Sequence, residues 1–166
     1  ICLTEAQKEL VKNYSDLEDA EAAIKVVQLI ETKADGIGGE VTAKNYAEGA
    51  AQRAVNAIKS AYDALKSAQG WVGNRDKYTS MVTAIAEFDQ EVADADTVFA
   101  EVTAMLNKEE ATQDFVDQAK AVAEKAQNII DEWGDESPLL GKLKNGNKTT
   151  LDNLNTAITR VETQLT

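Results

Sequence analysis

The fold is decided by residues 78–106, which read YTSMVTAIAEFDQEVADADTVFAEVTAML. Apolar side chains recur in this stretch at alternating steps of three and four residues: Tyr78, Met81, Ile85, Phe88, Val92, Ala95, Phe99, Val102 and Leu106. This spacing puts all of them on one face of a helix, as in the contact stripe of a coiled coil. Four heptads at about 1.5 Å of rise per residue predict a rod more than about 40 Å long, whose apolar face the rest of the chain must cover.

Two further helices are predicted before this one. The first, residues 4–34, opens with a capping box of Thr4 and Gln7 and should end at the glycines of 36–39. Its apolar stripe repeats at seven residues, Leu3, Leu10, Leu17 and Ile24, with Ala6, Ala20 and Val27 on the neighbouring row; Val26, Leu29 and Ile30 widen the stripe towards the end of the helix. The second, residues 42–69, has a stripe of mostly small side chains: Ala47, Ala51, Ala54, Ile58, Ala61, Leu65 and Ala68. Because small residues let helices approach closely, we expect these two helices to form an antiparallel hairpin.

Two glycine-linked features of this region need an interpretation. Gly49 falls inside the predicted second helix, and we interpret it as a site of close helix packing. Trp71 stands between Gly70 and Gly73, where a tryptophan is expected to cover the end of a core; an exposed binding tryptophan is the alternative.

Two more helices follow residue 106. Asn107 is expected to cap a helix over residues 108–133, with Glu110 at its third position and Gly134 after its end. Residues 134–148 form the longest irregular segment, in which Ser137-Pro138 can open a short helix. A last helix is predicted over residues 149–165. Its stripe and that of its predecessor contain Phe115, Ala119, Val122, Ala126, Ile129, Trp133, Leu151, Leu154, Ile158, Val161 and Leu165.

The predicted fold class is therefore all-α: one domain over residues 1–166, an elongated antiparallel bundle of about five helices with coiled-coil-like packing. A single proline and an alanine-rich composition agree with long helices. The stripe of residues 78–106 could pair with a second chain, but the other four stripes suffice to bury it. We expect a monomer.

Composition removes several classes of function. The net charge of −12 argues against binding nucleic acid or an anionic membrane surface. The chain has no histidine, so zinc-hydrolase, di-iron and Ser-His motifs are missing, and Cys2 is its only cysteine. Two acidic clusters, Glu91/Asp94/Asp96 and 131–136, lack the pattern of a calcium loop and are interpreted as solvated helix faces. We expect no catalytic, cofactor-binding or metal-binding residues, and we expect that the protein is not an enzyme.

Two N-glycosylation sequons are present, Asn13-Tyr14-Ser15 and Asn147-Lys148-Thr149. Asn13 falls near the apolar stripe of the first predicted helix, a poor position for a sugar. Asn147 falls in the long irregular segment and is the preferred candidate.

The chain resembles a known family in three features. These are the alanine-rich second helix, the stripe from Tyr78 to Leu106 and the helix faces rich in Glu and Asp. It resembles the glutamic acid/alanine-rich proteins that coat insect-stage African trypanosomes, within a wider helical group that includes variant surface glycoprotein N-terminal domains and the haptoglobin–haemoglobin receptor. The lone Cys2 departs from the disulfide-bonded variant surface glycoproteins. The resemblance implies a non-enzymatic coat protein on the extracellular side of a parasite cell membrane, held by a GPI anchor beyond residue 166.

Two alternatives to the coat function remain open. One is a helical surface receptor that binds a host or vector protein through an exposed apolar patch. The other is an intracellular coiled-coil adaptor or scaffold. The chain begins Ile1-Cys2-Leu3 without an initiator methionine, so we expect a fragment whose targeting and anchoring segments lie elsewhere. If the chain is a coat protein, we expect its partners to be neighbouring coat proteins. We expect it to contact the membrane only through the anchor.

Overall fold

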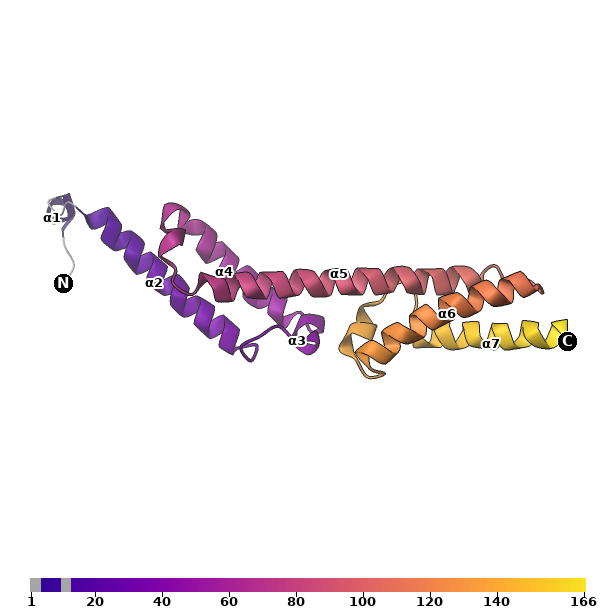
Figure 1. Cartoon of the computed structure of the whole chain (residues 1–166). Helices are drawn as coiled ribbons and strands as arrows, with labels where there is room; N and C mark the ends of the chain where they lie inside the picture. Colours follow the sequence, from indigo (N-terminus) through magenta and orange to yellow (C-terminus); the bar gives the residue numbers. More distant parts are fainter. Residues whose placement is uncertain (1–3, 10–12) are drawn as a thin grey trace. The chain divides into compact units, whose positions relative to one another are not determined.

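A computed structural model describes residues 4–9 and 13–166, and Figure 1 shows their course. The elements are, in order, α1 Glu5–Glu9, α2 Tyr14–Asp35, α3 Ala43–Ala47, α4 Ala50–Ala64, the 3-10 helix η1 Lys66–Trp71, α5 Arg75–Leu106, α6 Gln113–Trp133, the 3-10 helix η2 Pro138–Lys142, and α7 Lys148–Leu165. Over the described residues the predicted all-α fold class is confirmed. The predictions made for Cys2, Leu3 and Leu10 lie outside these residues.

The chain divides into two compact units, Ile1–Ile85 and Ala86–Thr166. The sequence predicted a single helical-bundle domain, and in the structure the buried apolar side chains form two clusters. Helix α5 crosses the boundary and has the predicted bounds. It gives Met81 and Ile85 to the cluster of the first unit, and Phe99 and Val102 to that of the second. Every residue of its predicted stripe is buried or partly buried.

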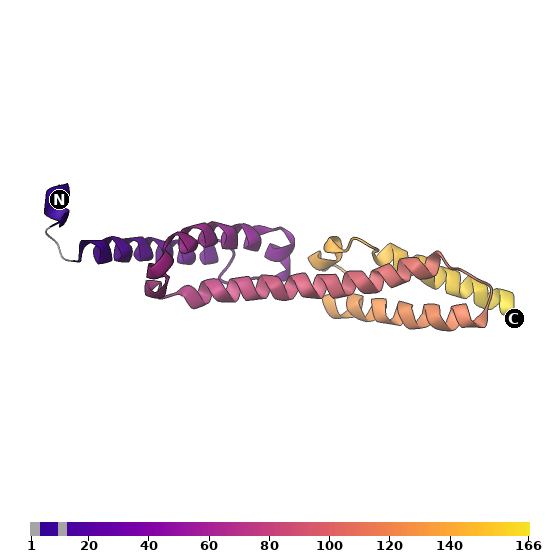
Figure 2. The same cartoon turned by 90° about the horizontal axis from the view of Figure 1, so that it is seen from above.

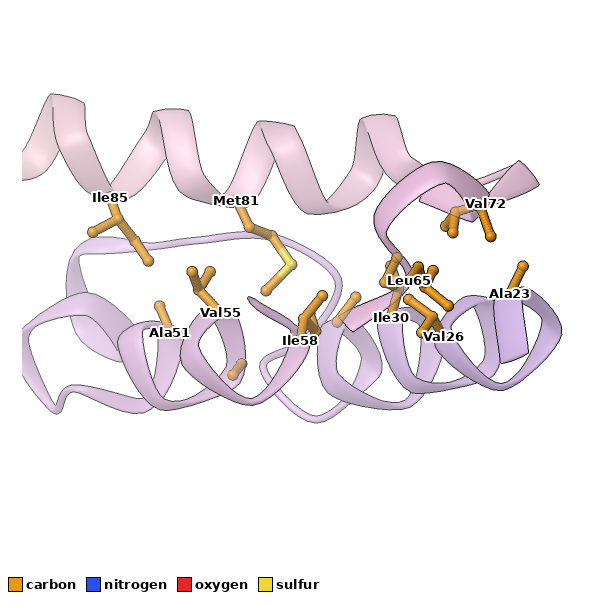
Figure 3. Close-up of a cluster of buried hydrophobic side chains, with 13 residues drawn as sticks. Ala23, Val26, Ile30, Ala51, Val55, Ile58, Leu65, Val72, Met81 and Ile85 are labelled. Atoms are coloured by element: carbon orange, nitrogen blue, oxygen red, sulfur yellow. The ribbon is translucent and has the colours of Figure 1, made fainter. Parts of the chain in front are cut away.

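In the first unit, α2 and α4 pack against each other and run in opposite directions (Figures 1 and 2). Ala51 and Ala54 of α4 are buried, and Ile30 of α2 is fully buried in the same cluster. Figure 3 shows Met81 and Ile85 pointing from α5 toward the side chains of α4. Small residues on α4 thus allow the close helix pairing that the sequence predicts.

Helix α2 buries only part of its predicted stripe, in which Val26 and Ile30 are buried as expected. Its buried residues are Ala23, Val26, Ile30 and Ala34. Leu17 and Ile24 of the predicted stripe are 50% and 56% exposed, so for these two the prediction was wrong. Neighbouring residues point about 100° apart around a helix, so α2 carries two apolar stripes. Its packing partners cover only one of them.

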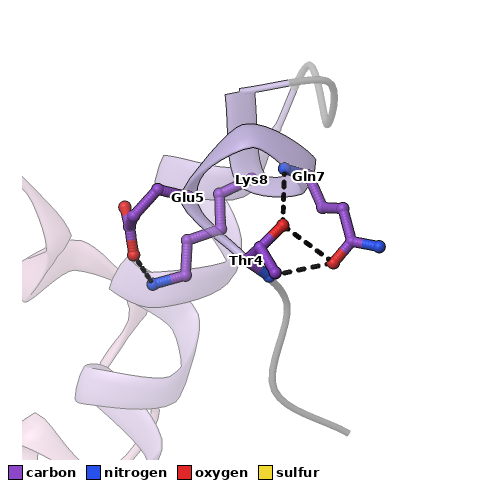
Figure 4. A network of polar contacts seen from close by, with 4 residues as sticks. All are labelled: Thr4, Glu5, Gln7 and Lys8. Atoms are coloured by element: carbon purple, nitrogen blue, oxygen red, sulfur yellow. Dashed lines mark hydrogen bonds and ion pairs between the residues drawn. The ribbon is translucent and has the colours of Figure 1, made fainter.

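The first predicted helix is also interrupted. The capping box of Thr4 and Gln7 is confirmed, since the Gln7 carboxamide accepts a bond from the Thr4 N–H at 2.9 Å (Figure 4). However, α1 ends at Glu9, and Asn13 lies in a turn before α2. A continuous helix over residues 4–34 is therefore wrong. Asn13 is the N-cap residue of α2, a position that asparagine favours over a helix interior.

The second predicted helix, residues 42–69, is likewise divided. Gly49 has φ +71°, a left-handed conformation that breaks the chain into α3 and α4. Its interpretation as a close-packing residue inside a helix is wrong, because glycine is needed here for its backbone. Thr42 caps α3 through a capping box with Asn45. A turn of 3-10 helix, η1, replaces the predicted last turn.

In the second unit, α6 and α7 pack together and share the core with the second part of α5. The predicted cap at Asn107 is wrong. Thr112 begins α6 instead, and its side chain accepts a bond from the Phe115 N–H at 3.2 Å. Gly134 caps the end of α6 with φ +85°, and Ser137-Pro138 opens η2, both as predicted. The apolar residues of α6 and α7 that are fully or almost fully buried are Phe115, Val116, Ala119, Ala123, Ala126, Ile130, Leu151, Leu154, Ala157, Ile158 and Val161.

Candidate functional surfaces

Asn147 is the residue that caps helix α7. Its backbone is extended, and its Oδ1 accepts a hydrogen bond from the Thr150 N–H at 3.0 Å. In return the Asn147 N–H donates to Thr150 Oγ1 at 3.1 Å, which completes a capping box. The side chain of Asn147 is exposed. The preferred sequon therefore begins at a helix terminus and faces solvent.

Asn13 lies at the corresponding position before α2, but its side chain makes no capping bond. It is exposed and lies in a turn. The reason given above for placing Asn13 second, a position inside a helix near the apolar stripe, does not hold in the structure. Residues 10–12, which precede it, lie outside the described part of the chain.

Asp96 of α5 holds the irregular segment before α7. Its Oδ1 accepts hydrogen bonds from the backbone N–H groups of Lys144 and Asn145 at 2.6 and 2.8 Å. Its Oδ2 accepts a third bond from Asn145 Nδ2 at 2.8 Å. Two helix turns further on from Asp96, Thr103 donates a hydrogen bond to the Asn145 carbonyl at 2.7 Å. We call these contacts the Asp96 clamp.

Gly146 extends the clamp by close packing. A Cβ at this position would lie 3.1 Å from both the Cβ and the carbonyl oxygen of Phe99. Phe99 itself is fully buried. The segment before α7 therefore passes so close to α5 that a side chain at position 146 would require Phe99 to shift. The sequence predicted an irregular segment over residues 134–148 and gave no sign of this contact.

The acidic clusters are used largely for structural contacts. Their carboxylates pair with neighbouring side chains: Glu91 with Trp133, Asp94 with Gln90, Asp131 with Gln127, and Asp135 with Lys148. Asp135 also raises the pKa of Lys148 through its hydrogen bond. Within residues 4–9 and 13–166, no group of three side chains is arranged to hold a metal ion.

A second polar cluster links α2 with the start of α5 in the first unit. Asn74 donates from Nδ2 to Glu31 Oε1 at 2.7 Å and to the Val27 carbonyl at 3.1 Å, and Lys77 forms an ion pair with Glu31. These donors hold the pKa of Glu31 below its ordinary value of 4.5, with the Lys77 hydrogen bond as the main cause. The same bond raises the pKa of Lys77.

Several large apolar side chains are exposed. Trp71, expected to cover a core end, is 52% exposed, and Val72 next to it is buried in its place. The glycines around Trp71 allow either orientation, so the sequence could not decide between the two residues. On α2, Leu17 and Ile24 lie one heptad apart on the uncovered face. Their seven-residue spacing was visible in the sequence, but it was read as core.

A helix that crosses a bilayer must be long and strongly apolar. None of the described helices combines the length and the apolar character that a bilayer-crossing segment needs. Comparisons of the chain with protein families, with curated proteins and with solved structures found no match.

Proposed function

We propose that this chain is the ectodomain of a non-enzymatic parasite surface-coat protein, anchored through lipid outside residues 1–166. A coat layer must stand in solvent and resist proteases, which cut exposed and locally unfolded segments. An acidic surface also keeps neighbouring copies soluble at high density. The net charge of −12 is consistent with this requirement.

The Asp96 clamp is the observation that supports this proposal most. Residues 134–147 are the longest stretch without an α-helix after α5, and a loop of this kind is the usual point of proteolytic attack. Here η2 shortens the irregular part, and three hydrogen bonds to Asp96 hold the remainder on α5. Such bonds raise the free energy of local opening, which a protease requires before it can cut.

The proposal is tested by releasing the native protein from intact cells with a phospholipase that cleaves GPI anchors. The coat function predicts that the protein moves from the cell pellet to the medium without lysis. A protein that stays in the cytosolic fraction, and appears there only after lysis, is instead the intracellular adaptor. A protein on the cell surface that the phospholipase does not release contradicts the GPI anchor alone.

The uncovered face of α2 favours one second candidate, a surface receptor for a host or vector protein. Leu17 and Ile24 are spaced to receive one apolar ridge of a partner helix. Glu21 lies between them, four residues after Leu17 and three before Ile24, and is exposed. A partner helix with leucine-like residues at heptad spacing and a Lys or Arg opposite Glu21 fits this face.

Site-directed photo-crosslinking on living cells in host fluid tests the receptor function. A crosslinker at position 21 should capture a host protein that a crosslinker at the exposed position 164 does not. Leu17→Ser with Ile24→Ser should abolish the product, whereas Leu165→Ser, at a 44% exposed leucine of the second unit, should leave it unchanged. Equal crosslinking at both positions contradicts the receptor function.

A further inference from the structure

The cap of α7 and the second sequon share a residue but use different atoms. The capping box takes up the Asn147 N–H and Oδ1, together with the Thr150 N–H and hydroxyl. The sequon needs the Asn147 Nδ2 and the hydroxyl of Thr149. Among the described residues, none receives a hydrogen bond from Asn147 Nδ2. The cap therefore leaves free the nitrogen to which a sugar is attached.

The surroundings of Asn147 have room for a bulky group. Asn147, Lys148 and Thr149 are all exposed, and the Lys148 ammonium is drawn to Asp135 at 2.7 Å. On the other side, Gly146 packs on Phe99 and Asn145 is bonded to Asp96. Asn147 thus projects into solvent from a backbone that is held on both sides: by the Asp96 clamp before it and by the first turn of α7 after it.

We propose that Asn147 is an N-glycosylation site whose glycan coexists with the helix cap. In the reaction, Asn147 Nδ2 forms a bond to the anomeric carbon of a sugar on a polyprenyl diphosphate donor. The bond from that carbon to the phosphate oxygen breaks, the diphosphate leaves with the electron pair, and the amide loses one proton. The product is still an amide, so Oδ1 continues to accept the Thr150 N–H. The proposal rests on the surface function, because the secretory pathway supplies the donor.

A glycan at this position has a consequence for the coat function. It stands at the end of the irregular segment 134–147, which the Asp96 clamp holds from within the protein. A bulky hydrophilic group there hinders the approach of a protease from solvent. The clamp and the glycan would then protect the same segment by two independent means.

The two neighbouring threonines allow a crossed test. Thr149→Ala removes the sequon and leaves every capping bond in place. Thr150→Ala removes the hydroxyl that accepts the Asn147 N–H and leaves the sequon intact. The native protein, and the chain directed into the secretory pathway by an added signal, are treated with peptide N-glycosidase, which converts a glycosylated asparagine to aspartate. Mass spectrometry of the fragment after Glu136 then reports position 147, and the fragment with residue 13 reports the other sequon.

In Thr149→Ala, we expect that the enzyme no longer converts Asn147 to aspartate. In Thr149→Ser and Thr150→Ala, we expect that this conversion still occurs. The thermal midpoint of the glycosylated chain should match that of the enzyme-treated chain, since aspartate caps a helix as asparagine does. An unmodified Asn147 in a chain that has passed through the secretory pathway overturns the glycosylation site and leaves the coat function standing. A native protein that never enters the pathway overturns the coat function, while the signal-directed chain still decides the site.

Discussion

Phe99 is the largest side chain that is completely buried in the described structure. It lies in the core of the second unit, and the backbone of Gly146 passes directly against it. Phe88, one of the other aromatic residues of the same predicted stripe, is only partly buried. The two phenylalanines were expected to be equivalent from their periodicity, and the structure separates them.

We predict that Phe99→Ala lowers the free energy of unfolding by about 3–5 kcal/mol, because it removes a buried ring and leaves a cavity. Phe88→Ala should cost clearly less, since part of that ring remains in water in the folded state. Urea unfolding followed by circular dichroism measures both. Equal losses in the two variants would show that position 88 is as deeply buried as position 99.

At Gly49, substitution by alanine distinguishes the observed break from a continuous helix, because the two predict changes in stability of opposite sign. With φ +71°, alanine is strained by about 1–2 kcal/mol, and its Cβ would approach the Arg53 guanidinium at 3.2 Å. Gly49→Ala should therefore destabilise the chain. In an uninterrupted helix the same change would stabilise it by about 1 kcal/mol. Gly73→Ala, where nothing lies within 4 Å, serves as the control, and thermal unfolding gives the sign for both.

At the scale of elements, the link between α2 and α5 depends on a carboxylate with a lowered pKa. The folded form holds Glu31 ionised through Lys77 and Asn74, so its contribution to stability is present above the ordinary pKa of 4.5. The contribution is lost as the pH falls through the lower pKa of the folded state. We predict that Glu31→Gln flattens the acid limb of the melting temperature against pH, while Glu21→Gln, at an exposed position of the same helix, leaves it unchanged. Superimposable profiles of wild type and Glu31→Gln would refute the link.

The Asp96 clamp is an element-scale contact between α5 and the segment before α7. Asp96→Ala leaves the exposed N–H groups of Lys144 and Asn145 to water and removes the bonds that hold this segment on α5. We predict faster cleavage within residues 134–147 under limited proteolysis, with the fragments identified by mass. Asp94→Ala, whose carboxylate accepts a hydrogen bond from Gln90 of its own helix, is the control. A cleavage rate equal to that of wild type would mean that the clamp does not protect the segment.

Helices with one apolar stripe could be predicted from the sequence, and α5 is the clearest case, with both ends correct. Helix α2 was harder, because Leu17 and Ile24 form one stripe and Val26 and Ile30 belong to another. Periodicity is the same for both, and the choice depends on which neighbours pack against the helix. The start of α6 was predicted wrongly for a similar reason: Asn107 and Thr112 both suit an N-cap, and only the completed loop shows that Thr112 is used.

The candidate sites divide in the same way. The sequon at Asn147 is a local pattern and can be read directly. The clamp joins Asp96 to Asn145, which are 49 residues apart, so no local pattern reveals it. Gly146 gave no signal either, because its role follows from the approach of Phe99. Contacts between distant segments require the packed structure, whereas a sequon requires only neighbouring residues.

At the scale of the whole molecule, the sequence predicted one bundle core, and the chain instead divides into two compact units that each bury a cluster of apolar residues. Helix α5 takes part in both, which explains why its stripe reads as one uninterrupted pattern. A continuous stripe does not tell whether its partners form one core or two.

Chemical labelling of living cells tests the proposed surface location of this protein. A membrane-impermeant amine reagent should modify exposed lysines of the native protein, such as Lys44 and Lys144, on intact cells in which a cytosolic marker stays unlabelled. The coat function predicts the same labelled lysines before and after permeabilisation. Labelling of these lysines only after permeabilisation would place the protein inside the cell and contradict the coat function.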